Sequence, residues 1–214
     1  MNLIRTTLLF ALILTNQLLF SQAKKTSEEI LKDVSEKTKS YSSIKVNFTY
    51  NMDNPGAKVH ESETGTLLVK GDKYRLDIAG QNVICDAVTS WTYLAESNEV
   101  QVNAVETDEA VITPTKLLTS YSEDYKSKLT GEVTKNGQAL YVIELKPNNV
   151  KSVTGVELNI DKELLRIMRI AIQDKSGNTF TYIVNKFETN VPVKDSDFTF
   201  NEKDHPGVEV IDMR

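Results

Sequence analysis

Cysteine is nearly absent from this sequence of 214 residues. Cys85 is the only one, so no disulfide can form within the chain, and buried apolar area must stabilise the fold instead. Cys85 follows Val83 and Ile84 in an apolar run, and no histidine stands near it. This setting favours a small core residue over the alternative, a reactive or pairing thiol.

Histidines and catalytic motifs are equally scarce. The two histidines, His60 and His205, lie far apart, and the sequence contains no Gly-x-Ser-x-Gly, His-Glu-x-x-His or glycine-rich phosphate loop. The acidic group Glu106, Asp108 and Glu109 does not match the ligand spacing of a calcium loop. The sequence therefore predicts a protein that is not an enzyme and that uses no cofactor and no metal. A hydrolase is the least favoured alternative.

The sequence has no excess of positive charge either. The formal net charge is −5 at pH 7, which gives no electrostatic attraction for nucleic acid or for anionic lipid head groups. We therefore expect neither as a partner.

Residues 1–23 have the pattern of a secretory signal peptide. A short positive start at residues 1–5 precedes a mostly apolar stretch at residues 8–20, and Ser21-Gln22-Ala23 places small residues at the cleavage site. We expect cleavage before Lys24, which leaves residues 24–214 as a single domain. A membrane anchor, the alternative, would need about 20 apolar residues in a row. No cysteine stands near the cleavage site to accept a lipid.

The remainder of the chain predicts two amphipathic helices and about eleven strands. Thr26 and Glu29 have capping-box spacing at the start of a helix over residues 26–41, and Pro114 lies near the start of a short helix that ends at Tyr121. Strands are predicted within residues 65–94 and at residues 44–52, 99–104, 125–133, 139–146, 153–160, 164–174, 179–188 and 208–211.

This pattern predicts a mainly β fold with an α-helical lid. A long antiparallel sheet tends to curl, so we expect an incomplete β-barrel of about eleven strands that the amphipathic helices cover. In the strand at residues 164–174 we expect Met168, Ile170 and Ile172 on one face and Leu165, Ile167 and Ala171 on the other. A strand that is apolar on both faces must be covered on both. The interior is either filled by side chains or left open for a ligand.

Several motifs in this order resemble the LolA family of periplasmic outer-membrane lipoprotein carriers. They are Gly-x-Leu-x-Val-x-x-x-x-Tyr-Arg from Gly65 to Arg75, Asp86 followed by Trp91-x-Tyr93, and Phe198-x-Phe200 before Pro206-Gly207-Val208-Glu209-Val210-Ile211. The resemblance covers essentially residues 24–214. It implies the periplasm of a Gram-negative bacterium and a monomer whose apolar concave face receives acyl chains. The implied partners are acylated lipoproteins, an inner-membrane lipoprotein-releasing ABC complex and an outer-membrane acceptor.

Candidate site residues follow from the predicted strands and lid. For each of them, ordinary core packing is the alternative to contact with an acyl chain. The family's latch arginine has no counterpart, because Gly71 stands at its position, and Ala87 replaces the glycine that usually follows the aspartate. Lys70, Lys73 and Arg75 are possible substitutes for the latch. The predicted cavity residues are Phe48, Tyr50, Leu67, Val69, Leu76, Trp91, Tyr93 and Met168, and the predicted lid residues are Leu117, Leu118 and Tyr121.

Two other functions use the same type of sheet. One is a periplasmic binding module for another lipid, and the other is a regulator. A regulator of that kind usually brings a further domain. The sequence alone leaves both open as alternatives to lipoprotein transport.

Overall fold

The computed structural model describes residues 24–105, 125–148 and 152–214. The predicted signal peptide, the second helix with Leu117, Leu118 and Tyr121, and the acidic group at residues 106–109 lie outside the described residues. No helix in the described part is long and apolar enough to cross a membrane. The elements are α1 (Ser27–Lys39), β1 (Ile44–Asn54), β2 (Val59–Lys70), β3 (Lys73–Ile78), β4 (Gln81–Cys85), β5 (Thr89–Leu94), β6 (Glu99–Ala104), β7 (Tyr125–Lys135), β8 (Gln138–Pro147), β9 (Val153–Asp161), β10 (Ile167–Asp174), β11 (Thr179–Thr189), η1 (Asp195–Phe198), η2 (Glu202–Asp204) and β12 (Glu209–Asp212).

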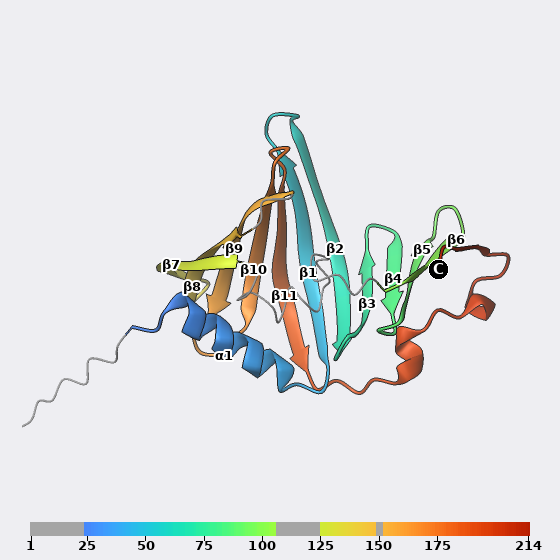
Figure 1. Cartoon of the computed structure of the whole chain (residues 1–214), viewed down its shortest axis with the longest axis horizontal. Helices are drawn as coiled ribbons and strands as arrows, with labels where there is room; N and C mark the ends of the chain where they lie inside the picture. Colours follow the sequence, from blue (N-terminus) through green and yellow to red (C-terminus); the bar gives the residue numbers. More distant parts are fainter. Residues whose placement is uncertain (1–23, 106–124, 149–151) are drawn as a thin grey trace, which may run out of the picture.

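The strands form one open sheet that curls without closing (Figure 1). Their order across the sheet is β12-β6-β5-β4-β3-β2-β1-β11-β10-β9-β8-β7. Neighbours are antiparallel except β12, which pairs parallel to β6. The pairing of β1 with β11 joins the first half of the chain to the second. The prediction of an incomplete antiparallel barrel is confirmed, with twelve strands in the described residues instead of about eleven.

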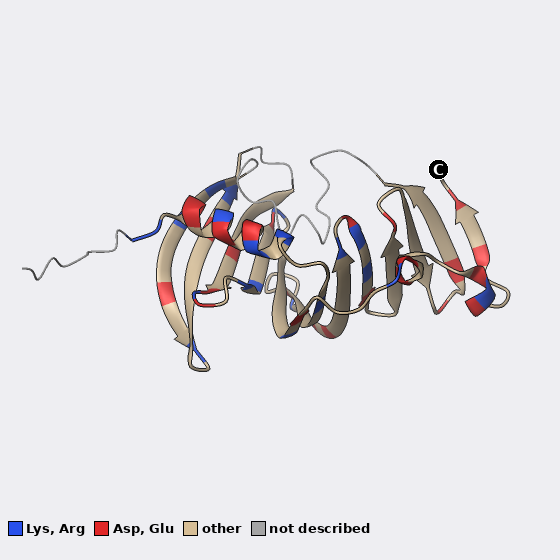
Figure 2. Cartoon of the chain, turned by 90° about the horizontal axis from the view of Figure 1, so that it is seen from below, with Lys and Arg blue, Asp and Glu red and all other residues tan. Residues whose placement is uncertain are grey.

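Helix α1 lies across one face of the sheet, which we call the inner face (Figures 1 and 2). The predicted capping box is present, because the Glu29 N–H donates to Thr26 Oγ1 over 3.2 Å and the Thr26 N–H donates to Glu29 Oε2 over 2.9 Å. The apolar stripe of Ile30, Leu31 and Val34 is buried against β8, β9 and β10. The charged residues of α1 are exposed, except for the half-buried Asp33, as expected for an amphipathic helix.

The C-terminal segment covers the opposite, outer face at the other end of the sheet. Phe200 and Val208 pack on Ile84 and Val100 of β4 and β6, together with the Trp91 and Tyr93 side chains of β5. Phe198, in η1, has no exposed surface. The segment ends in β12, which extends the sheet beyond β6.

Two strand predictions were wrong. The strand predicted from residue 164 begins at Ile167, because Leu165 has a positive φ of 51° in a tight turn. A bulge then leaves Met168 without a partner on β9, and this shifts the alternation by one residue. Ile167 and Ile170 therefore both pack in the α1 cluster instead of facing opposite sides, and Met168 does not continue their row.

Candidate functional site

The strand register places a continuous apolar surface on the inner face, from β11 through β1 to β4. Directly opposed residues of an antiparallel sheet share a face, so the pairs can be followed from strand to strand. The members of this surface are Phe180, Tyr182, Val184, Phe187, Ile44, Val46, Phe48, Tyr50, Met52, Leu67, Val69, Tyr74, Leu76, Ile78, Val83 and Cys85.

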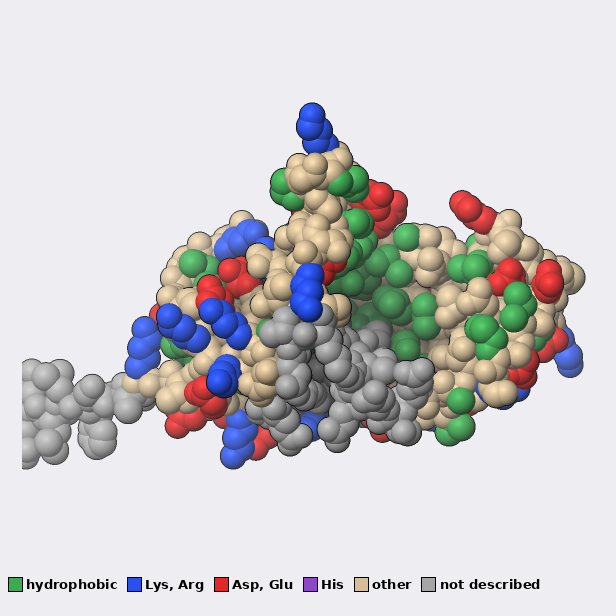
Figure 3. Space-filling view, turned by 45° about the horizontal axis from the view of Figure 1, so that its top comes forward, with side chains coloured by type: hydrophobic (Ala, Val, Ile, Leu, Met, Phe, Trp, Pro, Cys, Tyr) green, Lys and Arg blue, Asp and Glu red, His purple; other side chains and the backbone are tan. Residues whose placement is uncertain are grey.

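The two halves of the inner face are covered differently. Over β8 to β10, Ile30 and Val34 of α1 seal the face and are themselves 0% exposed. The cluster around Phe48, over β1 to β3, has Tyr41 as its single member from outside the strands in the described part of the chain. Several side chains in it, including Tyr50 and Leu76, are only partly buried. Figure 3 shows hydrophobic side chains gathered in a hollow beside the projecting β1–β2 hairpin.

Aromatic rings form the middle of this surface. The Tyr50 ring stacks on Phe180, with centroids 6.5 Å apart, and approaches Tyr182 at 5.3 Å, while Phe48 lies 5.9 Å from Tyr182. Burial raises the pKa of both Tyr50 and Tyr182. Burial also raises the pKa of Tyr74 to about 12. These phenols are therefore neutral at physiological pH, and the surface offers large rings without charge.

Five of the eight predicted cavity residues lie together on the inner face. They are Phe48, Tyr50, Leu67, Val69 and Leu76. Phe48, Leu67 and Val69 are buried, so they form the floor of the face, whereas Tyr50 and Leu76 keep exposed surface. Contact of any of them with a ligand stays a prediction.

The structure does not bring the other three predicted cavity residues to this surface. Val83 is opposite Thr92, so Trp91 and Tyr93 project from the outer face. There they pack under Phe200 of the C-terminal segment. Met168 lies at the bulge in β10, away from the Phe48 cluster.

The three proposed latch residues also lie on the outer face. Lys70 and Lys73 form ion pairs with Asp195 of η1, with Nζ–Oδ1 distances of 3.0 and 3.2 Å. These two ammonium groups lower the pKa of the Asp195 carboxyl. Arg75 Nε lies 3.8 Å from Asp77 Oδ2 on its own strand. In the described structure, then, Lys70 and Lys73 hold the C-terminal segment to the sheet.

The remaining reactive side chains have structural partners. Cys85 is buried next to Tyr74 on the inner face, and burial raises the pKa of its thiol. His60 pairs with Asp53 in the β1–β2 hairpin, at 2.5 Å between Nδ1 and Oδ1. His205 stacks on Phe200, with ring centroids 4.8 Å apart. Within the described residues, no group of three or more metal-ligating side chains comes together.

Sequence reasoning missed the contribution of β11. Phe180, Tyr182, Val184 and Phe187 continue the apolar surface beyond β1. The alternation in residues 179–184 signalled a half-buried strand, but a β-bulge opposite Asn47 and Phe48 shifts the register of the remaining residues. The pairing of β11 with β1 links residues more than 120 positions apart, and no local pattern reveals it.

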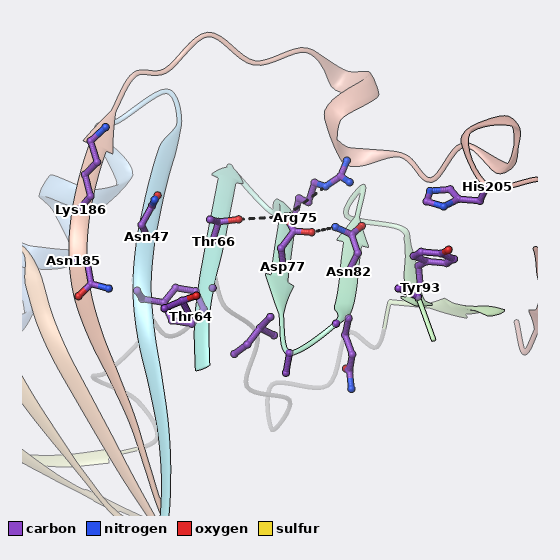
Figure 4. A pocket seen from close by; sticks show the side chains of 17 residues that line it. Asn47, Thr64, Thr66, Arg75, Asp77, Asn82, Tyr93, Asn185, Lys186 and His205 are labelled. Carbon is purple, nitrogen blue, oxygen red and sulfur yellow. Dashed lines mark hydrogen bonds and ion pairs between the residues drawn. The ribbon is translucent and has the colours of Figure 1, made fainter. Parts of the chain in front are cut away.

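A polar groove of about 690 Å³ runs over the outer face (Figure 4). Its axis is a row of directly opposed residues on six neighbouring strands: Lys186, Asn47, Thr66, Asp77, Asn82 and Tyr93. The Thr66 hydroxyl donates to Asp77 Oδ2 over 3.3 Å, and the Asn82 amide donates to Asp77 Oδ1. Asn47 Oδ1 is buried and has no hydrogen-bond partner. We call this feature the outer groove.

A family model matches most of this chain, and a solved structure shares its fold. The family model "Outer membrane lipoprotein carrier protein LolA" matches residues 39–201, well over half of the chain. A comparison with curated protein sequences finds no match. Among solved structures, an uncharacterized conserved protein from Thermus thermophilus is similar with a TM-score of 0.59 at 13% identity, covering 86% of this chain and 98% of its own.

Two further solved structures are similar at lower TM-scores. A LolA superfamily protein from Nitrosomonas europaea has a TM-score of 0.46 at 16% identity, covering 83% of this chain and 99% of its own. An outer membrane lipoprotein-sorting protein domain from Vibrio parahaemolyticus has a TM-score of 0.45 at 14% identity, covering 80% and 95%.

Proposed function

We propose that this chain, which belongs to the LolA family of outer membrane lipoprotein carrier proteins, is a periplasmic carrier that shields the acyl chains of lipoproteins from water. In this proposal it receives acylated lipoproteins from an inner-membrane releasing ABC complex and delivers them to an outer-membrane acceptor. The activity is binding and release, and the chain performs no catalysis. The observation that carries the proposal is the apolar inner face of β1 to β4 and β11, which α1 leaves uncovered among the described residues.

Energetics require such a surface. Each buried methylene contributes about 0.8 kcal/mol, so an acyl chain of about 16 carbons gains about 12 kcal/mol on leaving water. A lipoprotein cannot cross an aqueous compartment at a useful rate unless a carrier supplies a comparable apolar environment.

Release is as necessary as binding, and the composition of the face suits it. Tyr50, Tyr182 and Phe180 offer large planar surfaces without charge, and their contacts with an acyl chain involve no directional bond that must be broken. Met52 adds an adaptable side chain at the edge of the same row. Affinity is therefore set mainly by the apolar area that the ligand covers.

The test of this proposal introduces one charge into the face. Val83 lies on the inner face of β4 opposite Leu76, is half-buried and belongs to no packed cluster. Val83→Glu should weaken binding of a triacylated cysteine by at least tenfold, because a carboxylate would have to be desolvated beneath the acyl chains. Val88→Glu is the matched control, since Val88 is 73% exposed in a turn.

Two further measurements test the biological role. Mass spectrometry of molecules that copurify with the protein should find acylated lipoproteins. Depletion of the protein in cells should leave lipoproteins in the inner membrane. Normal lipoprotein sorting after depletion would contradict the proposed role, even if another lipid is found bound. A bound lipid of another class would favour the binding-module alternative.

A further inference from the structure

The sheet has a notch where the β3–β4 hairpin ends and the β1–β2 hairpin continues. β2 pairs with β1 along its whole length, from Val59 to Lys70. It pairs with β3 only from Gly65 to Lys70, because β3 ends at Ile78 opposite Gly65. In the described structure, residues 59–64 of β2 therefore have a strand neighbour on one side only. An unpaired strand edge is a template for an additional strand.

The turn between β2 and β3 fixes which backbone groups face this open edge. Lys70 and Lys73 close a two-residue turn at Gly71-Asp72, in which Gly71 has a φ of +56°. The closing pair of such a hairpin exchanges both backbone hydrogen bonds. Hydrogen-bonded pairs recur at every second residue, and no bulge interrupts β2. Thr64, Ser62 and His60 therefore direct their N–H and C=O groups into the notch.

The notch is continuous with both surfaces described above. Phe48 and Ile78 belong to the inner apolar cluster and also line the outer groove. Gly65, between them, has no room for a side chain, because a Cβ there would lie 2.5 Å from Phe48 Cζ and 2.8 Å from the Asp77 carbonyl oxygen. Thr64, at the first unpaired position of β2, lines the groove as well (Figure 4). A molecule could therefore contact the apolar face, the strand edge and the groove at once.

The chemistry of the groove fits a polypeptide better than a simple anion or cation. It presents the cations Arg75 and Lys186, the anion Asp77, and amide and hydroxyl groups that can both donate and accept. Asn47 Oδ1 is a buried acceptor that lacks a donor. A peptide backbone alternates N–H donors and C=O acceptors. The strand edge and these side chains offer hydrogen-bond partners to both.

We propose that the notch holds the peptide that directly follows the acylated residue of the cargo, in extended conformation along the open edge of residues 60–64. This inference rests on the proposed function, because the acyl chains must lie on the inner face for the attached peptide to reach the notch. The peptide adds a strand beside β2, and its side chains enter the outer groove. The carrier thus recognises the junction between lipid and polypeptide in addition to the acyl chains.

The experiment compares three probes: a ten-residue peptide with an N-terminal triacylated cysteine, the same triacylated cysteine without the peptide, and the peptide without acyl chains. Thr64→Pro removes one edge N–H and leaves the β1–β2 ladder intact, since Pro is tolerated where the N–H faces away from a partner. Thr64→Val retains the N–H and is the matched control. We expect Thr64→Pro to weaken binding of the lipopeptide about tenfold, as the loss of one hydrogen bond requires. Binding of the peptide-free lipid should not change in either variant, and Thr64→Val should bind the lipopeptide more tightly than Thr64→Pro does, because it keeps the edge N–H.

Each other outcome contradicts a defined part of the argument. If Thr64→Pro weakens the binding of both acylated probes equally, or of neither, the notch does not bind the peptide of the cargo. Tight binding of the peptide without acyl chains would mean that the notch takes a partner protein and not the cargo. Failure of the wild type to bind the peptide-free lipid would instead refute the proposed function.

Hydrogen exchange tests the same inference on the wild-type protein, without any substitution. The amides of Ser62 and Thr64 should exchange more slowly with the lipopeptide bound than with the peptide-free lipid bound. Identical exchange with the two probes would overturn the inference.

Discussion

Gly65→Ala tests the close packing at the centre of the sheet. The added Cβ would lie 2.5 Å from Phe48 Cζ and 2.8 Å from the Asp77 carbonyl oxygen, distances that real Cβ atoms do not show. Overpacking of this kind costs about 1–3 kcal/mol. A smaller opposing effect, about 0.4–1 kcal/mol, comes from the reduced entropy of the unfolded chain. We therefore expect a net loss of about 1–2 kcal/mol in the free energy of unfolding.

The chain offers a matched control for this substitution. Gly131 lies in β7, and a Cβ there would meet no atom within 4 Å. Gly131→Ala should be neutral or stabilise the fold by up to about 1 kcal/mol, because only the unfolded-state effect remains. Urea unfolding, followed by far-ultraviolet circular dichroism and by the fluorescence of Trp91, measures both. Equal changes in the two variants would refute the packing argument.

A double mutant separates the two contacts of the added methyl group. Phe48→Leu removes the ring atoms next to Gly65, so Gly65→Ala should cost less in that background than in the wild type. The contact with the Asp77 backbone remains, so part of the cost should persist. An undiminished cost would show that the Phe48 ring is not what excludes a side chain at Gly65.

Three further predictions concern the covering elements and the buried phenols. Ile30→Ala should lower the free energy of unfolding by about 2–5 kcal/mol, because Ile30 is 0% exposed in the α1 cluster, and urea unfolding measures this. Stability should fall as the pH rises from about 10 toward 12. Burial raises the pKa of the Tyr74 phenol to about 12 in the folded protein, so the phenol ionises at lower pH in the unfolded chain. Tyr74→Phe should reduce this pH dependence in urea titrations. Asp195→Asn should lower stability slightly near pH 7. The difference in stability from the wild type should vanish as the pH falls through the lowered pKa of the Asp195 carboxyl. Trp91 fluorescence can follow the unfolding of both proteins.

The strands with a half-buried, alternating pattern were predictable from the sequence. Residues 44–52 alternate apolar and polar side chains, and β1 places those apolar side chains on the inner face. The first part of β2 escaped prediction, because residues 60–64 are exposed and burial imposes no pattern on them. The bulge at Met168 escaped for a different reason: it is a feature of the pairing between two strands, and one strand alone does not reveal it.

The placement of Trp91 and Tyr93 could have been derived from turn lengths. The turn at Ala79-Gly80 pairs Leu76 with Val83, and the next turn pairs Val83 with Thr92. Counting along these turns puts residue 92 on the face of Leu76 and its neighbours on the other face. The prediction placed Trp91 and Tyr93 in the cavity because they are aromatic. The face on which a strand residue lies is set instead by its position in the alternation of the paired strands.

The open inner surface follows from where the chain places its two covering segments. A sheet that is apolar on both faces needs cover on both, and the described chain supplies α1 for the inner face at β8 to β10 and the C-terminal segment for the outer face at β4 to β6. The ion pairs of Asp195 with Lys70 and Lys73 fix the second segment to its own end of the sheet. Because the two segments cover opposite faces at opposite ends, neither seals the inner face of β1 to β4 in the described structure. Val83→Glu, with its control Val88→Glu, acts on that uncovered area alone. We expect it to reduce lipid binding and to leave the free energy of unfolding unchanged. That result would separate the surface used for binding from the core used for stability.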